Sequence, residues 1–227
     1  TYLVDDTAGE VVVLDPDGTY VTTIDFASAF SFAVVTAYDV VVGPDGRVFV
    51  SGEIGDTTDE VAAENGHGIV AVIDPDAEYA VSVFAQTSDP ASALAIDSSG
   101  RVFVANWNND SISVFNPDGN LLKVIESNEL ADGDDTGVAG LGLGTDDLLY
   151  LSKPWFGVVK VVNFDGSLAD VFDVGGNPWA VDVSPIGNIY VTDSGTDLIH
   201  VLAPNGAVIR TITIGNDASL SDITVWN

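Results

Sequence analysis

Three aspartates occupy related positions in short apolar segments, and they are the first candidates for cation chemistry. They are Asp39, Asp182 and Asp222. Asp39 and Asp222 match when the repeats of the chain are aligned. Asp182 is displaced by two residues, which keeps it on the same face of a β-strand because side chains alternate with a period of two. Carboxylates gathered around a narrow axis repel one another. The pattern therefore favours either an axial cation or carboxylates that bind backbone amides or water.

Two acidic segments, residues 55–68 and 129–137, carry oxygen ligands of the kind that Ca²⁺ prefers. The second segment has a Gly that permits a sharp turn but lacks the distal bidentate Glu of an EF-hand. Each segment is interpreted either as a calcium loop or as a solvated polar loop. The candidate ligands in them are Asp56, Asp59, Glu60, Glu64, Asp132, Asp134 and Asp135.

Tryptophan is the residue best suited to stack on a sugar ring, and the chain has four of them. Trp107 and Trp155 follow equivalent predicted strands, so we expect them on one face, as binding aromatics for a glycan or as packing and subunit contacts. Trp179 and Trp226 lie on or beside apolar segments and are expected in the core.

Other catalytic constellations are weak in this sequence. His67 and His200 are its only histidines and fall in different repeats, whereas a zinc site needs three converging protein ligands. There is no Cys and no G-x-S-x-G element. A metal-assisted lyase or hydrolase is therefore an alternative to a non-catalytic protein, and the latter is favoured.

Two series of turns divide the chain into repeats that must position these residues. Turns such as Asp15–Gly18 and Asn116–Gly119 recur at intervals of 40 to 59 residues. A second series, represented by Gly43–Gly46 and Ser184–Gly187, keeps step with the first. Pro presets φ at the second position of many of these turns and Gly supplies a positive φ at the exit. Short segments rich in Val, Ile, Phe and Tyr between them predict β-strands.

Four strands per repeat of this length are typical of a β-propeller blade. We predict one all-β propeller domain over residues 1–227, with about five four-stranded blades. The C-terminal strand is expected to complete the N-terminal blade, because Ser221–Trp226 matches the first strand that this blade lacks. The predicted blades are 1–26 with 218–227, 37–86, 91–127, 137–174 and 177–217.

Particular repeats resemble known families. Residues 101–115 are similar to the YVTN-type repeat, and residues 188–193 with 200–206 resemble the NHL repeat. The resemblance implies a propeller but not one activity, because such repeats serve in enzymes, ligand scaffolds and surface proteins. Propeller lyases of this kind use His and acidic residues around the channel, and no matching multi-His set is found. Family members usually have six or seven blades. Five blades leave open a tighter ring or a terminal strand that completes a neighbouring molecule.

The charge balance limits the partners of the protein. Asp and Glu number 35 against six Lys and Arg, giving a formal net charge of −29. Three explanations of this acidic excess remain open: the use of aspartate in turns, adaptation to high salt, and binding of divalent cations. Nucleic acid is excluded as a partner because no basic patch is present. Membrane insertion is excluded because no apolar run approaches the ~20 residues needed.

These observations predict a non-catalytic extracellular scaffold or adhesion protein of a prokaryote. We expect a mature chain from which a leader has been removed, located outside the cell or on its surface. It would act by self-association, into a polymer or filament, or by binding a cell-surface glycan or protein, with Ca²⁺ as a structural ion. Besides the enzyme, a ligand-sensing domain is the remaining alternative.

Overall fold

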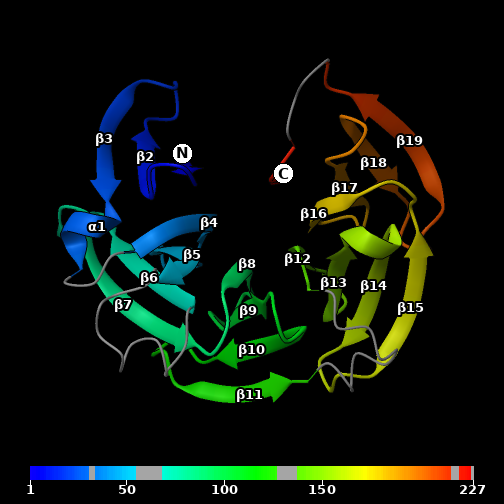
Figure 1. The fold of residues 1–227 in the computed structure, drawn as a ribbon, viewed down its shortest axis with the longest axis horizontal. Helices are drawn as coiled ribbons and strands as arrows, with labels where there is room; N and C mark the ends of the chain where they lie inside the picture. The colour runs from blue at the N-terminus through cyan, green and yellow to red at the C-terminus, as the bar shows by residue number, and fades with distance from the viewer. Residues whose placement is uncertain (31–33, 55–67, 127–136, 216–219, 226–227) are drawn as a thin grey trace. The chain divides into compact units, whose positions relative to one another are not determined.

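The structure is a computed structural model that describes residues 1–30, 34–54, 68–126, 137–215 and 220–225 (Figure 1). Strands in these residues form five antiparallel sheets, each made of segments that are consecutive in the chain. This up-and-down arrangement is that of propeller blades, and the protein is an all-β propeller as predicted. The described helical elements are one helical turn, α1 (Phe26–Ala29), and the 3₁₀ turns η1 (Pro75–Ala77) and η2 (Pro154–Phe156).

The first two sheets lie at the N-terminal end of the chain. The first contains β1 (Tyr2–Asp5), β2 (Glu10–Leu14) and β3 (Tyr20–Asp25). The second contains β4 (Val34–Val42), β5 (Val48–Ile54), β6 (Gly68–Asp74) and β7 (Ala80–Thr87).

The other three sheets have four strands each, in the same order. The third contains β8 (Ala91–Ile96), β9 (Val102–Asn106), β10 (Ser111–Phe115) and β11 (Leu121–Ile125). The fourth contains β12 (Gly140–Leu143), β13 (Leu148–Lys153), β14 (Val158–Asn163) and β15 (Leu168–Asp173). The fifth contains β16 (Pro178–Val183), β17 (Ile189–Asp193), β18 (Leu198–Leu202) and β19 (Val208–Thr213).

The turns between strands follow the local sequence. At the turn before β11 the Gly119 amide donates to the Asn116 carbonyl over 3.0 Å, and Gly119 has a φ of +84°. A Cβ at this position would lie 2.5 Å from the Phe84 carbonyl oxygen, so only glycine fits. The second sheet has Ala77 where the other turns have Gly. There the chain forms η1, and Glu78 and Tyr79 take the left-handed conformation instead.

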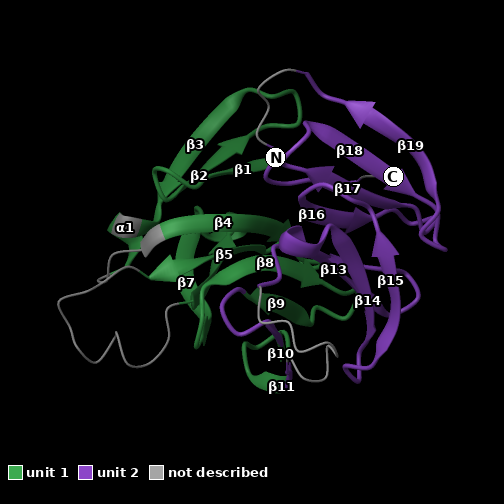
Figure 2. Ribbon diagram, turned by 45° about the vertical axis from the view of Figure 1, so that its right-hand side comes forward, with its two compact units in different colours: residues 1–106, 113–123 green, residues 107–112, 124–227 purple. Residues whose placement is uncertain are grey.

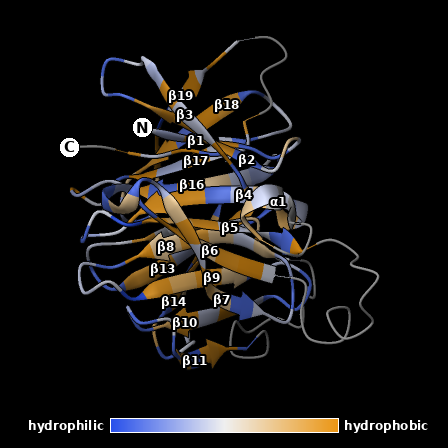
Figure 3. Cartoon of the chain, turned by 90° about the vertical axis from the view of Figure 1, so that its left-hand side faces the viewer, coloured by the Kyte–Doolittle hydropathy of each residue, from blue (hydrophilic) through white to orange (hydrophobic). Residues whose placement is uncertain are grey.

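Contacts divide the chain into two compact units, residues 1–106 with 113–123 and residues 107–112 with 124–227 (Figure 2). In the first unit, side chains of β2, β5 and β6 such as Val11, Val50 and Ile69 share one buried cluster. In the second, Tyr150 and Val191 belong to the cluster between β12–β15 and β16–β19. Figure 3 shows that apolar residues follow the strands while polar residues gather in the loops. That the chain is a single domain stays a prediction.

The C-terminal segment differs from the prediction in one respect. Residues 220–225 are described but are not assigned to a strand, and the first sheet contains three strands among the described residues. The segment contacts β16, where the Val225 amide donates a hydrogen bond to Asp182. Its pairing with the first sheet therefore stays a prediction.

Candidate functional site

The first-strand aspartates bind backbone amides in the structure. Asp39 lies on β4, and its Oδ1 accepts a hydrogen bond from the Val40 amide over 2.7 Å. Its Oδ2 accepts one from the Leu94 amide of β8, also over 2.7 Å. A single carboxylate thus joins the first strands of two consecutive sheets. Leu94 is buried, so this hydrogen bond satisfies an amide that water does not reach.

Asp182 repeats the same arrangement on β16. Its Oδ1 accepts from the Val183 amide and its Oδ2 from the Val225 amide of the terminal segment, both over 2.7 Å. Asp222, on that segment, accepts from the Ile223 amide over 2.6 Å. Of the two interpretations left open by the sequence, these contacts correspond to carboxylates bonded to backbone amides. A cation at these positions stays a prediction.

Asp182 and Asp222 affect each other electrostatically. Burial raises the pKa of Asp182, and the negative charge of Asp222 raises it further, although the amides of Val225 and Val183 act in the opposite direction. Asp222 is exposed at its surface, yet crowding by neighbouring atoms removes part of its solvation and raises its pKa, an effect that the Ile223 amide partly offsets. The two side chains therefore form a pair of carboxylates whose ionisation is disfavoured.

The predicted calcium loops lie outside the described residues. This holds for Asp56, Asp59, Glu60, Glu64, Asp132, Asp134 and Asp135, and also for His67 and Trp226. Within the described ranges, no three His, Asp or Glu side chains converge in a group that could hold a metal ion. Nor do these ranges include a helix long and apolar enough to cross a membrane.

The two candidate binding tryptophans have different environments. Trp155 lies on η2 with 69% of its surface exposed, next to the exposed Phe156. Trp107 instead packs against Trp179, with ring centroids 5.8 Å apart and the rings tilted by 43°. Gly137 approaches Trp107 so closely that a Cβ would lie 2.8 Å from its carbonyl oxygen. Trp155 is thus the accessible aromatic, whereas Trp107 has a packing contact.

His200 has a structural partner. Its Nε2 lies 3.5 Å from Oδ2 of Asp193, a buried carboxylate at the end of β17. Burial acts to raise the pKa of Asp193, but hydrogen bonds from Thr196, Asn177 and Gly195, together with the nearby His200, outweigh it and lower the pKa. Asp193 thus fixes the loops around β17 as an ionised acceptor.

Pairing of the scarce basic residues was not foreseen from the sequence. Arg47 Nε lies 2.7 Å from Asp45 and the guanidinium sits over Phe49. Arg101 repeats this pairing with Asp97 and Phe103. The signal was present, because Gly-Arg-Val-Phe-Val occurs at both places. In addition Lys153 Nζ lies 2.6 Å from Asp110, and both side chains are almost completely buried. In these pairs three of the six basic residues are matched by a neighbouring carboxylate.

Exposed apolar side chains on the outer strands were also missed. The last strand of each sheet along the chain is an edge strand, which pairs with a neighbour on one side only within the described residues. These outer strands are β3, β7, β11, β15 and β19. Every one of them carries exposed large apolar residues, for example Tyr20 at 61%, Leu122 at 57% and Ile209 at 54%. The full set is Tyr20, Val21, Val83, Leu121, Leu122, Leu168, Val171, Val208 and Ile209. We call these nine residues the outer-strand row.

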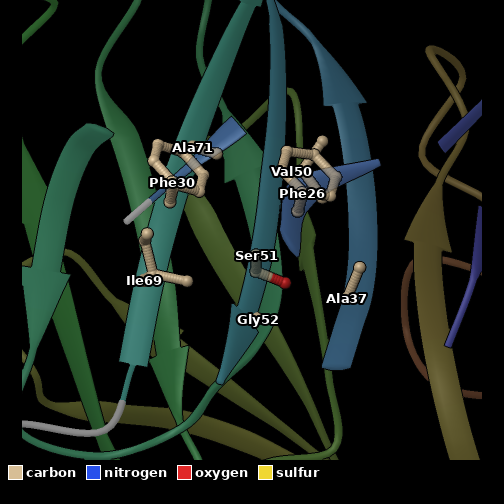
Figure 4. Close-up of a pocket in the computed structure, with 8 residues that line it drawn as sticks. All are labelled: Phe26, Phe30, Ala37, Val50, Ser51, Gly52, Ile69 and Ala71. Carbon is tan, nitrogen blue, oxygen red and sulfur yellow. The ribbon is translucent and has the colours of Figure 1, made fainter. Parts of the chain in front are cut away.

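A small pocket lies in the first unit, between α1 and the strands β4, β5 and β6 (Figure 4). Its lining is almost entirely apolar, and its volume of about 10 Å³ is at the lower limit for holding a single water molecule. The Ser51 hydroxyl, which has no hydrogen-bond partner in the described part of the chain, belongs to this lining. The pocket is therefore too small for a substrate.

Comparison with known proteins supports the fold. No family model and no curated protein matches the sequence. Among solved structures, the chain is similar to virginiamycin B lyase from Staphylococcus aureus, with 13% identity and a TM-score of 0.69 over 97% of this chain and 72% of that one. A protein of unknown function from Bacteroides caccae matches with 14% identity and a TM-score of 0.69 over 94% of this chain and 72% of that one.

A structure of a nidogen/laminin complex also matches, with 17% identity and a TM-score of 0.68 over 93% of this chain and 78% of that one. At such identities the likeness shows the fold, which is the β-propeller. It does not distinguish the NHL or YVTN repeats from other propeller repeats. The neighbours include a lyase and a protein found in a complex, so the shared fold accommodates both kinds of function.

Proposed function

We propose that this protein is a non-catalytic scaffold or adhesion propeller that self-associates through its outer strands. The observation that carries the proposal is the outer-strand row, which places exposed apolar residues on the edge strand of every sheet. An apolar edge strand with unpaired backbone groups is a template for pairing with another chain. The proposed contact is therefore strand addition between copies, supported by apolar side chains on both.

The negative charge decides when such contacts form. Two copies each carrying a formal charge of −29 repel at low ionic strength. The screening length falls from about 8 Å at 0.15 M salt to about 3 Å at 1 M. Association is therefore proposed to require salt or divalent cations, and Ca²⁺ is the proposed structural ion. An extracellular setting is part of the proposal, and it is supported by the acidic surface and by a sequence without Cys or Met.

The test uses lysine substitutions on the row. In the double variant Leu122→Lys and Ile209→Lys, edge lysines oppose strand pairing. The control variant, Val42→Lys and Ile186→Lys, makes the same change of charge at apolar residues that are exposed outside the outer strands. We expect the row variant to remain monomeric at 1 M NaCl, where the parent and the control associate. Equal association of both variants in sedimentation velocity would contradict the proposal.

A second candidate function is the binding of a partner at Trp155. The side chain is 69% exposed beside the exposed Phe156, and a large apolar ring at the surface suits stacking on a sugar or insertion into a protein partner. Binding of labelled glycans by the parent and by Trp155→Ala tests this candidate. Loss of binding with unchanged self-association would separate this function from that of the outer-strand row.

A further inference from the structure

The terminal segment contacts β16 in the way that β8 contacts β4. In each pair the Asp of one first strand uses Oδ1 for the amide of its own following residue and Oδ2 for an amide of the next segment. The distances are 2.7 Å in all four hydrogen bonds. The two cases lie in different compact units and so are independent examples of one geometry.

The spacing between the acceptor on one strand and the donor on the next segment also agrees. Counted back from the first residue of the following turn, Asp39 is at position four and its donor Leu94 at position three. Asp182 is at position two, and its donor Val225 is at position one when Asp222 is aligned with Asp39. In both cases the donor stands one position further along its strand than the acceptor. The terminal segment therefore has the register of a first strand relative to β16.

We propose that Asp182 docks residues 220–225 on β16 as the first strand of a further blade, and that the charge of Asp222 opposes this docking. The two neighbouring carboxylates have opposite effects. Asp182 accepts two amides and is the docking residue. Asp222 accepts the amide of its own neighbour and adds a second negative charge close to the first.

The other groups around Asp182 do not neutralise this pair. Tyr190 faces Asp182 across the β16–β17 register. β12, which packs on β16, consists of Gly and Leu residues. β13 also contacts β16, but its Lys153 is paired with Asp110. Burial raises the pKa of Asp182, and the charge of Asp222 raises it further, which is the direction expected when a second carboxylate lies close by.

Amide hydrogen exchange followed by NMR tests the proposal on the full chain at pH 7 and low salt. In Asp182→Ala the Val225 amide loses its acceptor, and we expect its exchange to become at least about tenfold faster. In Asp222→Asn the repulsion is removed, and we expect the Val225 amide to exchange more slowly than in the parent. Addition of 1 M NaCl should reproduce that slowing in the parent.

Two controls keep the test specific. The Leu94 amide, held by Asp39, reports whether the fold of Asp182→Ala is intact and should not change. Asp170→Asn removes an exposed carboxylate on β15 that also bonds the amide of its following residue, and it should leave Val225 unaffected. Faster Val225 exchange in Asp222→Asn, or unchanged exchange in Asp182→Ala, would overturn the proposal.

Discussion

The two sides of β16 are held by different chemistry. On the β12 side, Gly140 and Gly142 pack directly on the β16 backbone, and Ser152 bridges the strands by accepting from the Gly140 amide and donating to the Trp179 carbonyl. On the other side, Asp182 reaches the terminal segment with a carboxylate. The first contact depends on shape and neutral hydrogen bonds, the second on an ionisable group. We infer that the glycine side is the permanent contact and that the aspartate side responds to pH and salt.

The largest effect is expected from adding a side chain on the glycine side. A Cβ on Gly140 would lie 2.5 Å from the Trp179 carbonyl oxygen and 2.8 Å from the Ala180 Cα, and backbone cannot move aside cheaply. Gly140→Ala should lower the free energy of unfolding by about 3 kcal/mol in urea denaturation. Gly142→Ala is the matched control, because its nearest contact would be 3.0 Å and it should cost less. Equal losses would show that shape does not decide this contact.

A smaller loss is expected when the bridging hydroxyl is removed. Ser152→Ala leaves the Gly140 amide and the Trp179 carbonyl without their shared partner in a buried place. Stability should fall by about 2 kcal/mol, by the same amount between pH 5 and pH 8 because no ionisable group is involved. If the loss in thermal stability depended on pH, the β12 side of β16 would not differ from the terminal-segment side in the way we infer.

The equivalent aspartate contact in the first unit should be weaker. Asp39→Ala leaves the buried Leu94 amide unsatisfied, but the carboxylate is only half-buried and the ionised form also costs desolvation. We expect a loss of about 1.5 kcal/mol, with faster exchange of the Leu94 amide and no change at Val225. A loss as large as that of Gly140→Ala would contradict the proposed ranking.

The smallest effect is the pH dependence of the aspartate side. The pKa values of Asp182 and Asp222 are raised in the folded protein, so their contribution to stability is complete below the ordinary carboxyl pKa. It is lost as pH rises through the raised values. The stability difference between Asp222→Asn and the parent should therefore increase with pH over this window and then level off. A difference that is constant with pH, measured by urea denaturation, would argue against the coupled pair.

Local features explain what could be predicted from the sequence. Turn residues such as Asn116 and Gly119, and the runs of Val, Ile and Phe between turns, fix the hairpins through short-range preferences, and the propeller follows from their repetition. The contact of Asp39 with Leu94 joins residues 55 positions apart, and no local pattern specifies it. The repeat alignment placed Asp39, Asp182 and Asp222 on one kind of strand but did not show that backbone amides are their partners.

The outer-strand row was missed for a related reason. The runs Leu121–Leu122 and Val208–Ile209 match buried strands in composition, and exposure depends on whether another strand covers the edge. Likewise Trp107 and Trp155 occupy equivalent places in their repeats, yet a nearby Trp179 gives one of them a packing partner. Burial is decided by neighbours that are distant in the sequence.

Mass in solution tests the central claim, which is that the protein associates through its outer strands once its charge is screened. Light scattering would be recorded in low salt, in 1 M NaCl, and in Ca²⁺ before and after addition of a chelator. The account predicts a 23.6 kDa monomer in low salt and larger species in 1 M NaCl and in Ca²⁺, with the chelator reversing the latter. A single 23.6 kDa species in every condition would contradict the claim.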